Sequence, residues 1–313
     1  MNRYTGWKSF LSFFSAEHAQ AFLKKKYQLK NLENPHEKSF DNCYAFLYYL
    51  EHGHIYYEQA EKAPLILKPI LLFYGLVHLV KACILTIDPD YPESTTVLAH
   101  GVSTRKRKKQ NYHFFHDEVK IQKNGLFPFM SQSMFHMEQL EGEKVSMEIL
   151  LQLIPELSQL FFQLEGKQTF IKLHRHNDQL LIPEEILDYY HMTANRFKDF
   201  MMARFPGTIL FSDDNLSCTA ADSLLNKITP LKYNIEEQSF VLPLFKNNFF
   251  HFPELLVHYL LLYNLSMIAR YETEWWGELT KMMPTKDYPF IQSFLSVTEQ
   301  KSPFLIYQFL MEK

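Results

Sequence analysis

Residues 69–109 read PILLFYGLVHLVKACILTIDPDYPESTTVLAHGVSTRKRKK, and this stretch decides the fold class. Its first part predicts an apolar helix that runs to about residue 87, interrupted only by Tyr74, His78 and Lys81. The DPDYP sequence that follows predicts a stop and a turn. A membrane-spanning helix needs about 20 mostly apolar residues. We therefore interpret this segment as a buried core helix and expect no membrane partner.

Further helices follow from apolar residues at helical spacing on both sides of this stretch. Pro155 should kink or split one of them, and the Ser302-Pro303 pair predicts the start of the final helix. The predicted helices cover residues 16–26, 41–61, 146–164, 183–204, 253–271 and 302–311.

The pattern changes after Gly166, where QTFIKLHRHNDQLLIP predicts strand, turn and strand. The fold class is therefore α+β and mainly α-helical, a helical bundle-like core with a small β-containing insert. We predict an N-terminal helical region at residues 1–165, a mixed α/β insert at 166–250, and C-terminal helices at 251–313 that pack on the N-terminal region as one integrated unit.

Composition limits the classes of function. With 313 residues, 47% of them hydrophobic and 21% charged, the chain can bury a sizeable core and is not disordered. Only 9 glycines, with neither a GxxxxGK[ST] nor a GxGxxG motif, argue against a phosphate-binding loop. The net charge of −3 means that any site for an anion must be a local patch.

The cysteines indicate a cellular compartment. Cys43, Cys83 and Cys218 are far apart and form no CxxC pair. A sparse, odd set of this kind fits a reducing cytoplasm, where free cysteine behaves as a small hydrophobic residue. The N-terminal sequence has no continuous apolar segment of the kind found in a signal peptide. We expect a cytoplasmic protein.

The three polar residues of the apolar helix form one candidate site. Tyr74, His78 and Lys81 fall at i, i+4 and i+7 and so share one face of the helix. Two interpretations remain open: a polar stripe that lines a pocket, or a stripe whose groups are satisfied by a neighbouring helix or by solvent.

The late helix carries a similar stripe at Tyr259, Tyr263, Ser266 and Arg270. It leads into Trp275 and Trp276, and an arginine beside paired tryptophans could form a cation–π shelf or clamp an anion. The alternative is a helix end locked by an Arg–Glu pair and covered by tryptophan.

A dense cationic run lies between these two helices. Five consecutive basic residues, beginning with Arg105 and including Arg107, follow His100-Gly101. Such a run concentrates a positive potential that could capture phosphate or nucleic acid, and the aromatic residues after it could stack on bases. A solvated charged loop is the alternative.

One enzymatic pattern is present. Arg107 and His113 give R-x5-H, which resembles the R-x4-6-H element of HEPN-type ribonucleases, helical proteins in which Arg and His act on RNA without a metal. About one such pair is expected by chance in a chain with this histidine content, so the spacing alone does not decide for catalysis.

A metal site is not predicted. His174, His176 and Asp178 alternate as strand ligands could. Their pattern is, however, that of a solvent-exposed strand face. We expect neither a metal nor a cofactor.

Two longer segments resemble a known family. Residues 71–129, LLFYGLVHLVKACILTIDPDYPESTTVLAHGVSTRKRKKQNYHFFHDEVKIQKNGLFPF, and residues 258–279, HYLLLYNLSMIARYETEWWGEL, are similar to the YaaC-like family of Bacillus-type bacteria. The resemblance extends over nearly the whole chain. It implies a bacterial cytoplasmic protein and supplies no catalytic residue.

The sequence thus favours a non-catalytic binding or regulatory protein that recognises a nucleotide, RNA or a partner protein, with an oligomer possible. A HEPN-like metal-independent ribonuclease that uses Arg107 and His113 is the alternative. The predicted ligand-binding residues are Tyr74, His78, Lys81, His100, Gly101, Arg105, Arg107, Arg270, Trp275 and Trp276.

Overall fold

The computed structural model describes residues 3–104, 112–177, 179–212, 216–220 and 228–312. The chain divides into two compact units, one formed by Asn2–Met147 with His258–Lys313 and the other by Glu148–Val257. The predicted α+β, mainly helical fold class is confirmed, because long helices dominate and the strands form three small antiparallel sheets.

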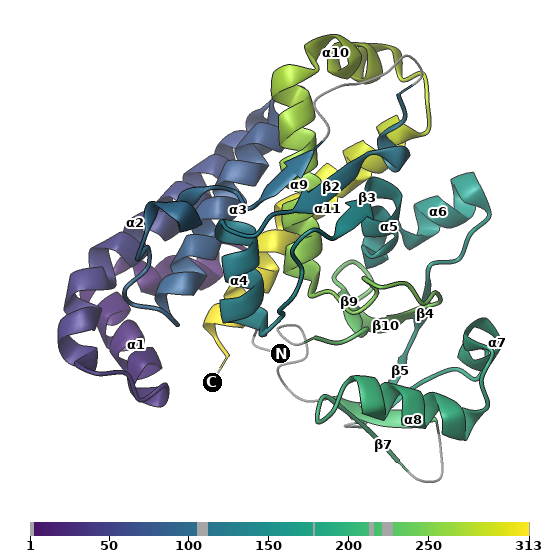
Figure 1. Ribbon diagram of the computed structural model, residues 1–313, viewed down its shortest axis with the longest axis horizontal. Coiled ribbons are helices and arrows are strands. Elements are labelled where there is room, and N and C mark those ends of the chain that lie inside the picture. Colours follow the sequence, from purple (N-terminus) through teal and green to yellow (C-terminus); the bar gives the residue numbers. More distant parts are fainter. Residues whose placement is uncertain (1–2, 105–111, 178, 213–215, 221–227, 313) are drawn as a thin grey trace. The chain divides into compact units, whose positions relative to one another are not determined.

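The larger unit is a set of long helices with one three-stranded sheet of order β1-β2-β3. Figure 1 shows α1, α2 and α3 side by side. The α9 helix enters this unit at residue 258. The elements are η1 (Lys8–Phe14), α1 (Ala16–Leu29), α2 (Pro35–Lys62), α3 (Lys68–Leu85), η2 (Thr95–Leu98), β1 (Val102–Thr104), η3 (Phe114–His116), β2 (Glu118–Ile121), α4 (Leu126–Phe135), β3 (Lys144–Ser146), α9 (Glu254–Tyr271), α10 (Thr273–Met282) and α11 (Asp287–Leu310).

The apolar helix predicted from residue 69 is α3, which packs against α2 on one side and α11 on another. Two glycines let α2 and α3 approach closely. A Cβ atom on Gly75 would lie 2.7 Å from a ring carbon of Tyr57, and one on Gly53 would lie 2.5 Å from Leu79 Cδ2. Gly53 costs α2 about 1 kcal/mol of helix propensity relative to alanine, and the close packing explains why glycine stands there.

Within the described residues, α3 is the one helix long and apolar enough to cross a membrane by length and composition, and 67% of it is buried inside the structure. A mostly buried helix of this kind is also what a protein core contains, so it gives only weak support for a membrane span.

The predicted start of the last helix at Ser302-Pro303 is wrong. The helix α11 begins at Asp287 and carries Pro303 in its interior. A proline there removes one backbone hydrogen bond and costs about 3 kcal/mol. Burial of an almost continuous apolar surface, which includes Phe290, Phe294 and Ile306, outweighs that local cost.

The smaller unit contains short helices and the other two sheets, with strand orders β4-β10-β9 and β5-β6-β8-β7. The predicted split at Pro155 is confirmed, because α5 ends at Gln152 and a 3-10 turn begins at Pro155. The elements are α5 (Met147–Gln152), η4 (Pro155–Leu157), α6 (Ser158–Glu165), β4 (Phe170–Lys172), β5 (His174–His176), β6 (Gln179–Leu181), α7 (Ile186–Tyr190), α8 (Ala194–Arg204), β7 (Ile209–Phe211), β8 (Ser217–Ala220), β9 (Lys232–Asn234) and β10 (Ser239–Pro243).

Candidate functional site

The polar stripe of α3 lies against a matching stripe of α2. Tyr74, His78 and Lys81 are half-buried on one face of α3. The His78 ring stacks on Tyr56 with a centroid separation of 5.6 Å and an angle of 18°. It also meets the edge of His52 at 5.2 Å. The Lys81 ammonium lies 5.6 Å from the ring centroid of Tyr49.

The polar stripe of α9 contacts the polar stripe of α3 through Arg270 and Tyr74. One terminal nitrogen of Arg270 donates to the Tyr74 hydroxyl at 3.2 Å, and the guanidinium carbon lies 5.8 Å from the Tyr74 ring centroid. His100 lies between the two stripes, with its ring 6.0 Å from Tyr74 and 5.8 Å from Tyr263. The structure therefore joins the two stripes that the sequence predicted separately.

We call this surface the basic aromatic face. It consists of Tyr49, His52, Tyr56, Tyr74, His78, Lys81, His100, Tyr263 and Arg270. Every member belongs to the larger unit.

The orientation of Arg270 is fixed by its surroundings. Its Nε donates to the Ser266 carbonyl oxygen at 3.1 Å, and its second terminal nitrogen contacts the Met267 sulfur at 3.1 Å. Together with the bond to Tyr74, these contacts use only part of the five N–H donors of a guanidinium. The remaining donors are held in place for a ligand without further loss of side-chain entropy.

The charges of the basic aromatic face are all positive. Among the described ion pairs, none includes Lys81 or Arg270. Burial is the largest cause of the lowered pKa of His100. The positive charges of Arg270 and Lys81 lower this pKa further, so both cations lie near the same imidazole. Unpaired cations beside aromatic faces favour an anionic ligand.

Two of the three histidines of this face, His78 and His100, have a lowered pKa. Burial lowers the pKa of His78 to about 4, with smaller contributions from Lys81 and His52. The Nδ1 atoms of His78 and His100 are buried and have no hydrogen-bond partner among the described atoms. A buried polar atom without a partner is costly, so these two atoms mark positions where a ligand or water is expected to bind.

Gly101 has a backbone role. Its φ angle is +78°, and a Cβ atom there would lie 2.4 Å from the Pro128 ring and 2.9 Å from the Phe127 nitrogen. It meets Gly125 directly, since a Cβ atom on Gly125 would lie 2.4 Å from the Gly101 Cα. The backbone just before β1 crosses the N-cap of α4 at this point, and only glycine fits.

The paired tryptophans have different surroundings. Trp276 is fully buried, and its Nε1 donates to the Ile66 carbonyl oxygen at 3.0 Å. Trp275 is half-buried and meets the Tyr112 ring edge-on at 4.7 Å. Trp276 thus anchors α10 to the segment before α3, and Trp275 is the one of the two with an accessible side.

The predicted residues Arg105 and Arg107 lie outside the described residues. Their proposed catalytic partner His113 is half-exposed, and its Nδ1 lies 4.0 Å from a carboxylate oxygen of the buried Asp287. The same oxygen accepts a hydrogen bond from the Phe114 backbone N–H at 3.0 Å.

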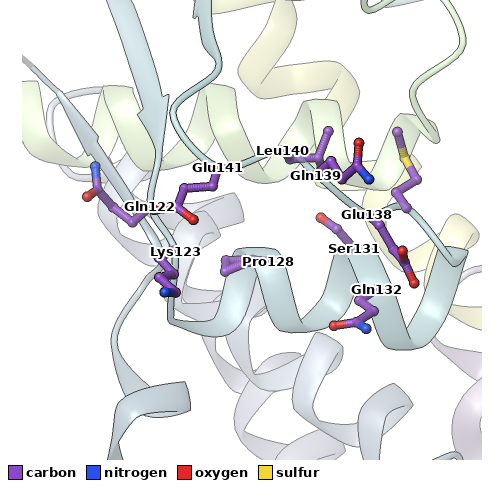
Figure 2. Close-up of a pocket in the computed structure, with 10 residues that line it drawn as sticks. Gln122, Lys123, Pro128, Ser131, Gln132, Glu138, Gln139, Leu140 and Glu141 are labelled. Carbon is purple, nitrogen blue, oxygen red and sulfur yellow. The ribbon is translucent and has the colours of Figure 1, made fainter.

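A pocket of about 360 Å³ lies elsewhere in the larger unit, beside α4 (Figure 2). Pro128, Ser131 and Gln132 of α4 line one side, and Glu138 and Glu141 line the other. Figure 2 shows the Glu141 carboxylate and the Ser131 hydroxyl pointing toward the space between them. The pocket contains none of the site residues predicted from the sequence. Two carboxylates, Glu138 and Glu141, and one cation, Lys123, are among its lining groups, whereas the charges of the basic aromatic face are all positive.

The described part of the chain contains no group of three His, Cys, Asp or Glu side chains that could hold a metal ion. His174 and His176 form the fully exposed strand β5, and Asp178 lies outside the described residues.

Sequence reasoning missed the α2 half of the basic aromatic face. Tyr49, His52 and Tyr56 fall at i, i+3 and i+7, a spacing that places three residues on one helix face, as the i, i+4 and i+7 spacing does on α3. A polar and aromatic stripe on each of two adjacent helices was the feature of the sequence that could have identified the α2 half of this face.

Comparison with known proteins gives one match. The family model described as YaaC-like Protein matches residues 11–310, nearly the whole chain, which confirms the resemblance found in the sequence. No curated protein and no solved structure matches the chain.

Proposed function

We propose that this chain, which belongs to the YaaC-like family, is a binding or regulatory protein that recognises a phosphate-bearing ligand on its basic aromatic face. The ligand class is a nucleotide or a short stretch of nucleic acid. A reducing bacterial cytoplasm suits the three cysteines, which are all free and buried.

One observation carries the proposal. Lys81 and Arg270 both lower the pKa of His100, and neither is paired with a described carboxylate. Half-buried cations without a counter-charge are unfavourable in the free protein. A bound phosphate would supply the missing charge and accept hydrogen bonds from the Lys81 ammonium and the free guanidinium donors.

The aromatic members of this face extend the recognition beyond phosphate. Tyr49, Tyr56 and the exposed His52 present rings beside the cations. Bases bind to such surfaces by stacking, while cations hold the backbone phosphates. A ligand that carries both a base and a phosphate uses the whole face.

The test is titration calorimetry of the full chain with ATP, GTP and a labelled single-stranded RNA at two salt concentrations. Lys81→Gln and Arg270→Gln should each weaken binding about tenfold, which is the loss of one charge-assisted hydrogen bond. Lys25→Gln removes one exposed charge from α1 and is the matched control. If none of these ligands binds, the phosphate assignment is wrong and a partner protein becomes the candidate for this face.

A second candidate function rests on His113. The half-exposed His113 has its Nδ1 4.0 Å from a carboxylate oxygen of the buried Asp287. This contact is longer than a hydrogen bond and would have to tighten with substrate bound before the carboxylate could orient a general base. This contact is the reason to keep the HEPN-like ribonuclease as the alternative. Incubation with labelled RNA in EDTA tests it: cleavage that His113→Ala abolishes supports the enzyme, and intact RNA at high protein concentration contradicts it.

A further inference from the structure

The smaller unit contains a sheet edge that is built to accept another strand. In the sheet of order β4-β10-β9, β4 is an outer strand and pairs only with β10 among the described residues. Figure 1 shows β4 beside β10 in this unit. An outer strand leaves one row of backbone N–H and C=O groups without ladder partners.

The register identifies those groups. Leu173 N–H donates to the Phe240 carbonyl oxygen at 2.9 Å, and Leu244 N–H donates to the Thr169 carbonyl oxygen at 2.8 Å. Hydrogen-bonded pairs alternate along an antiparallel ladder. The backbone groups of the odd-numbered residues of β4 therefore face β10, and those of Phe170 and Lys172 face outward.

The position of Pro243 agrees with this register. Pro243 lies opposite Phe170, at a pair that exchanges no ladder hydrogen bonds with β4, so its missing N–H leaves that ladder intact. Its carbonyl oxygen accepts a hydrogen bond from the buried Tyr190 hydroxyl at 3.0 Å. This hydrogen bond connects β10 to α7.

A cavity of about 610 Å³ runs along this outward edge. Three consecutive residues of the strand, Phe170, Ile171 and Lys172, are among its lining residues. Their side chains alternate between the two faces, so the cavity borders the edge of the strand. Glu185, Asp188 and Tyr189 form the opposite wall, and Tyr189 donates to Gln168 Oε1 at 2.7 Å across one end.

We infer that this groove binds an extended peptide segment of another protein, which adds to β4 as a new outer strand. The outward N–H and C=O groups of Phe170 and Lys172 bond its backbone. Side chains opposite Phe170 and Ile171 are apolar, because cross-strand neighbours share a face. Lys172 already pairs with Glu237 at 2.9 Å, so the position opposite it needs no acidic side chain. The carboxylates of Glu185 and Asp188 accept hydrogen bonds from the peptide N–H groups that face away from β4.

This inference does not depend on the proposed function, because all the residues of the groove belong to the smaller unit. The probe is a phage-displayed library of random 12-residue peptides selected on the full chain, followed by synthesis of the enriched peptide. Backbone hydrogen exchange of the full chain is then measured with and without that peptide.

The expected amide exchange rates differ between the even-numbered and the odd-numbered residues of β4 and its flanks. In the free protein the amides of Phe170 and Lys172 exchange fast, whereas those of Ile171 and Leu173 are protected by β10. The bound peptide slows exchange at Phe170 and Lys172 by about tenfold or more and leaves Ile171 and Leu173 unchanged.

Two variants at one position isolate the backbone bond. Lys172→Pro and Lys172→Val both remove the ammonium group, but only proline also removes the outward N–H. The peptide should bind the proline variant about tenfold more weakly than the valine variant, and far-UV circular dichroism checks that both remain folded.

Three results would overturn the inference. The first is a Phe170 amide that is already protected in the free protein. The second is a library that yields no peptide able to protect this amide, or equal affinity of the two variants. The third is a dimer in sedimentation that Lys172→Pro dissociates, which would make a second copy the occupant.

Discussion

Arg270 donates a hydrogen bond to the hydroxyl of Tyr74 over a distance of 3.2 Å, although the two residues are 196 positions apart in the sequence. This bond connects the end of α9 to the middle of α3. It places the guanidinium beside the histidines of the basic aromatic face and makes two separate helix stripes into one surface.

Tyr74→Phe tests that connection. The variant keeps the ring that Arg270 lies over but removes the hydroxyl, so the free energy of unfolding should fall by about 1 kcal/mol. Ligand affinity should fall several-fold, since Arg270 is then less well oriented. Calorimetry and urea denaturation measure the two effects. Tyr44→Phe, at an exposed tyrosine of α2, is the control, and an equal loss in both variants would show that Tyr74 has no special role.

The pKa of His78 predicts a dependence of stability on pH. Folding lowers this pKa from 6.5 to about 4, so the unfolded chain binds more protons between these values. The contribution of His78 is fully present above about pH 6.5 and is lost as the pH falls toward 4. The unfolding free energy of the wild type should therefore drop over this window more steeply than that of His78→Gln. Parallel curves from urea denaturation at each pH would contradict the assignment.

Gly75→Ala should destabilise the protein although alanine is the better helix former. The new Cβ would lie 2.7 Å from a ring carbon of Tyr57 and 3.0 Å from Tyr56 Cβ. Overpacking of this kind costs about 1–3 kcal/mol. Thermal unfolding measures the change.

Gly277→Ala is the control for that prediction. Gly277 lies in α10, and no described atom beyond its own helix backbone and its chain neighbours lies within 4 Å of the place that a Cβ would take, so alanine there should raise the free energy of unfolding by about 0.5–1 kcal/mol. A stabilising effect at both positions would show that α2 and α3 are not tightly packed at Gly75.

Substitution of the two tryptophans compares the contributions of a fully buried ring and a half-buried ring to stability. Trp276→Ala removes a fully buried ring and its bond to Ile66, and should cost about 3–5 kcal/mol. Trp275→Ala, at a half-buried ring, should cost clearly less. The free energy of unfolding from denaturant titration checks both, and similar losses would show that the rings are equivalent.

Much of the fold could be predicted from the sequence because the signals are local. Apolar spacing identified α3 and α9, and Pro155 divided a helical segment as its missing N–H requires. The same local rule failed at Pro303, where burial along α11 outweighs the cost of a proline inside the helix.

The sequence by itself also determined which residues share a helix face, since the period of the helix fixes that Tyr74, His78 and Lys81 lie together. Only the tertiary structure decided that Arg270 and His100 join them, that Trp276 turns inward, and that Gly101 serves a backbone crossing. The physical reason is that contacts between distant segments depend on how whole helices pack, and packing is set by the summed burial of many side chains and not by the spacing of any few.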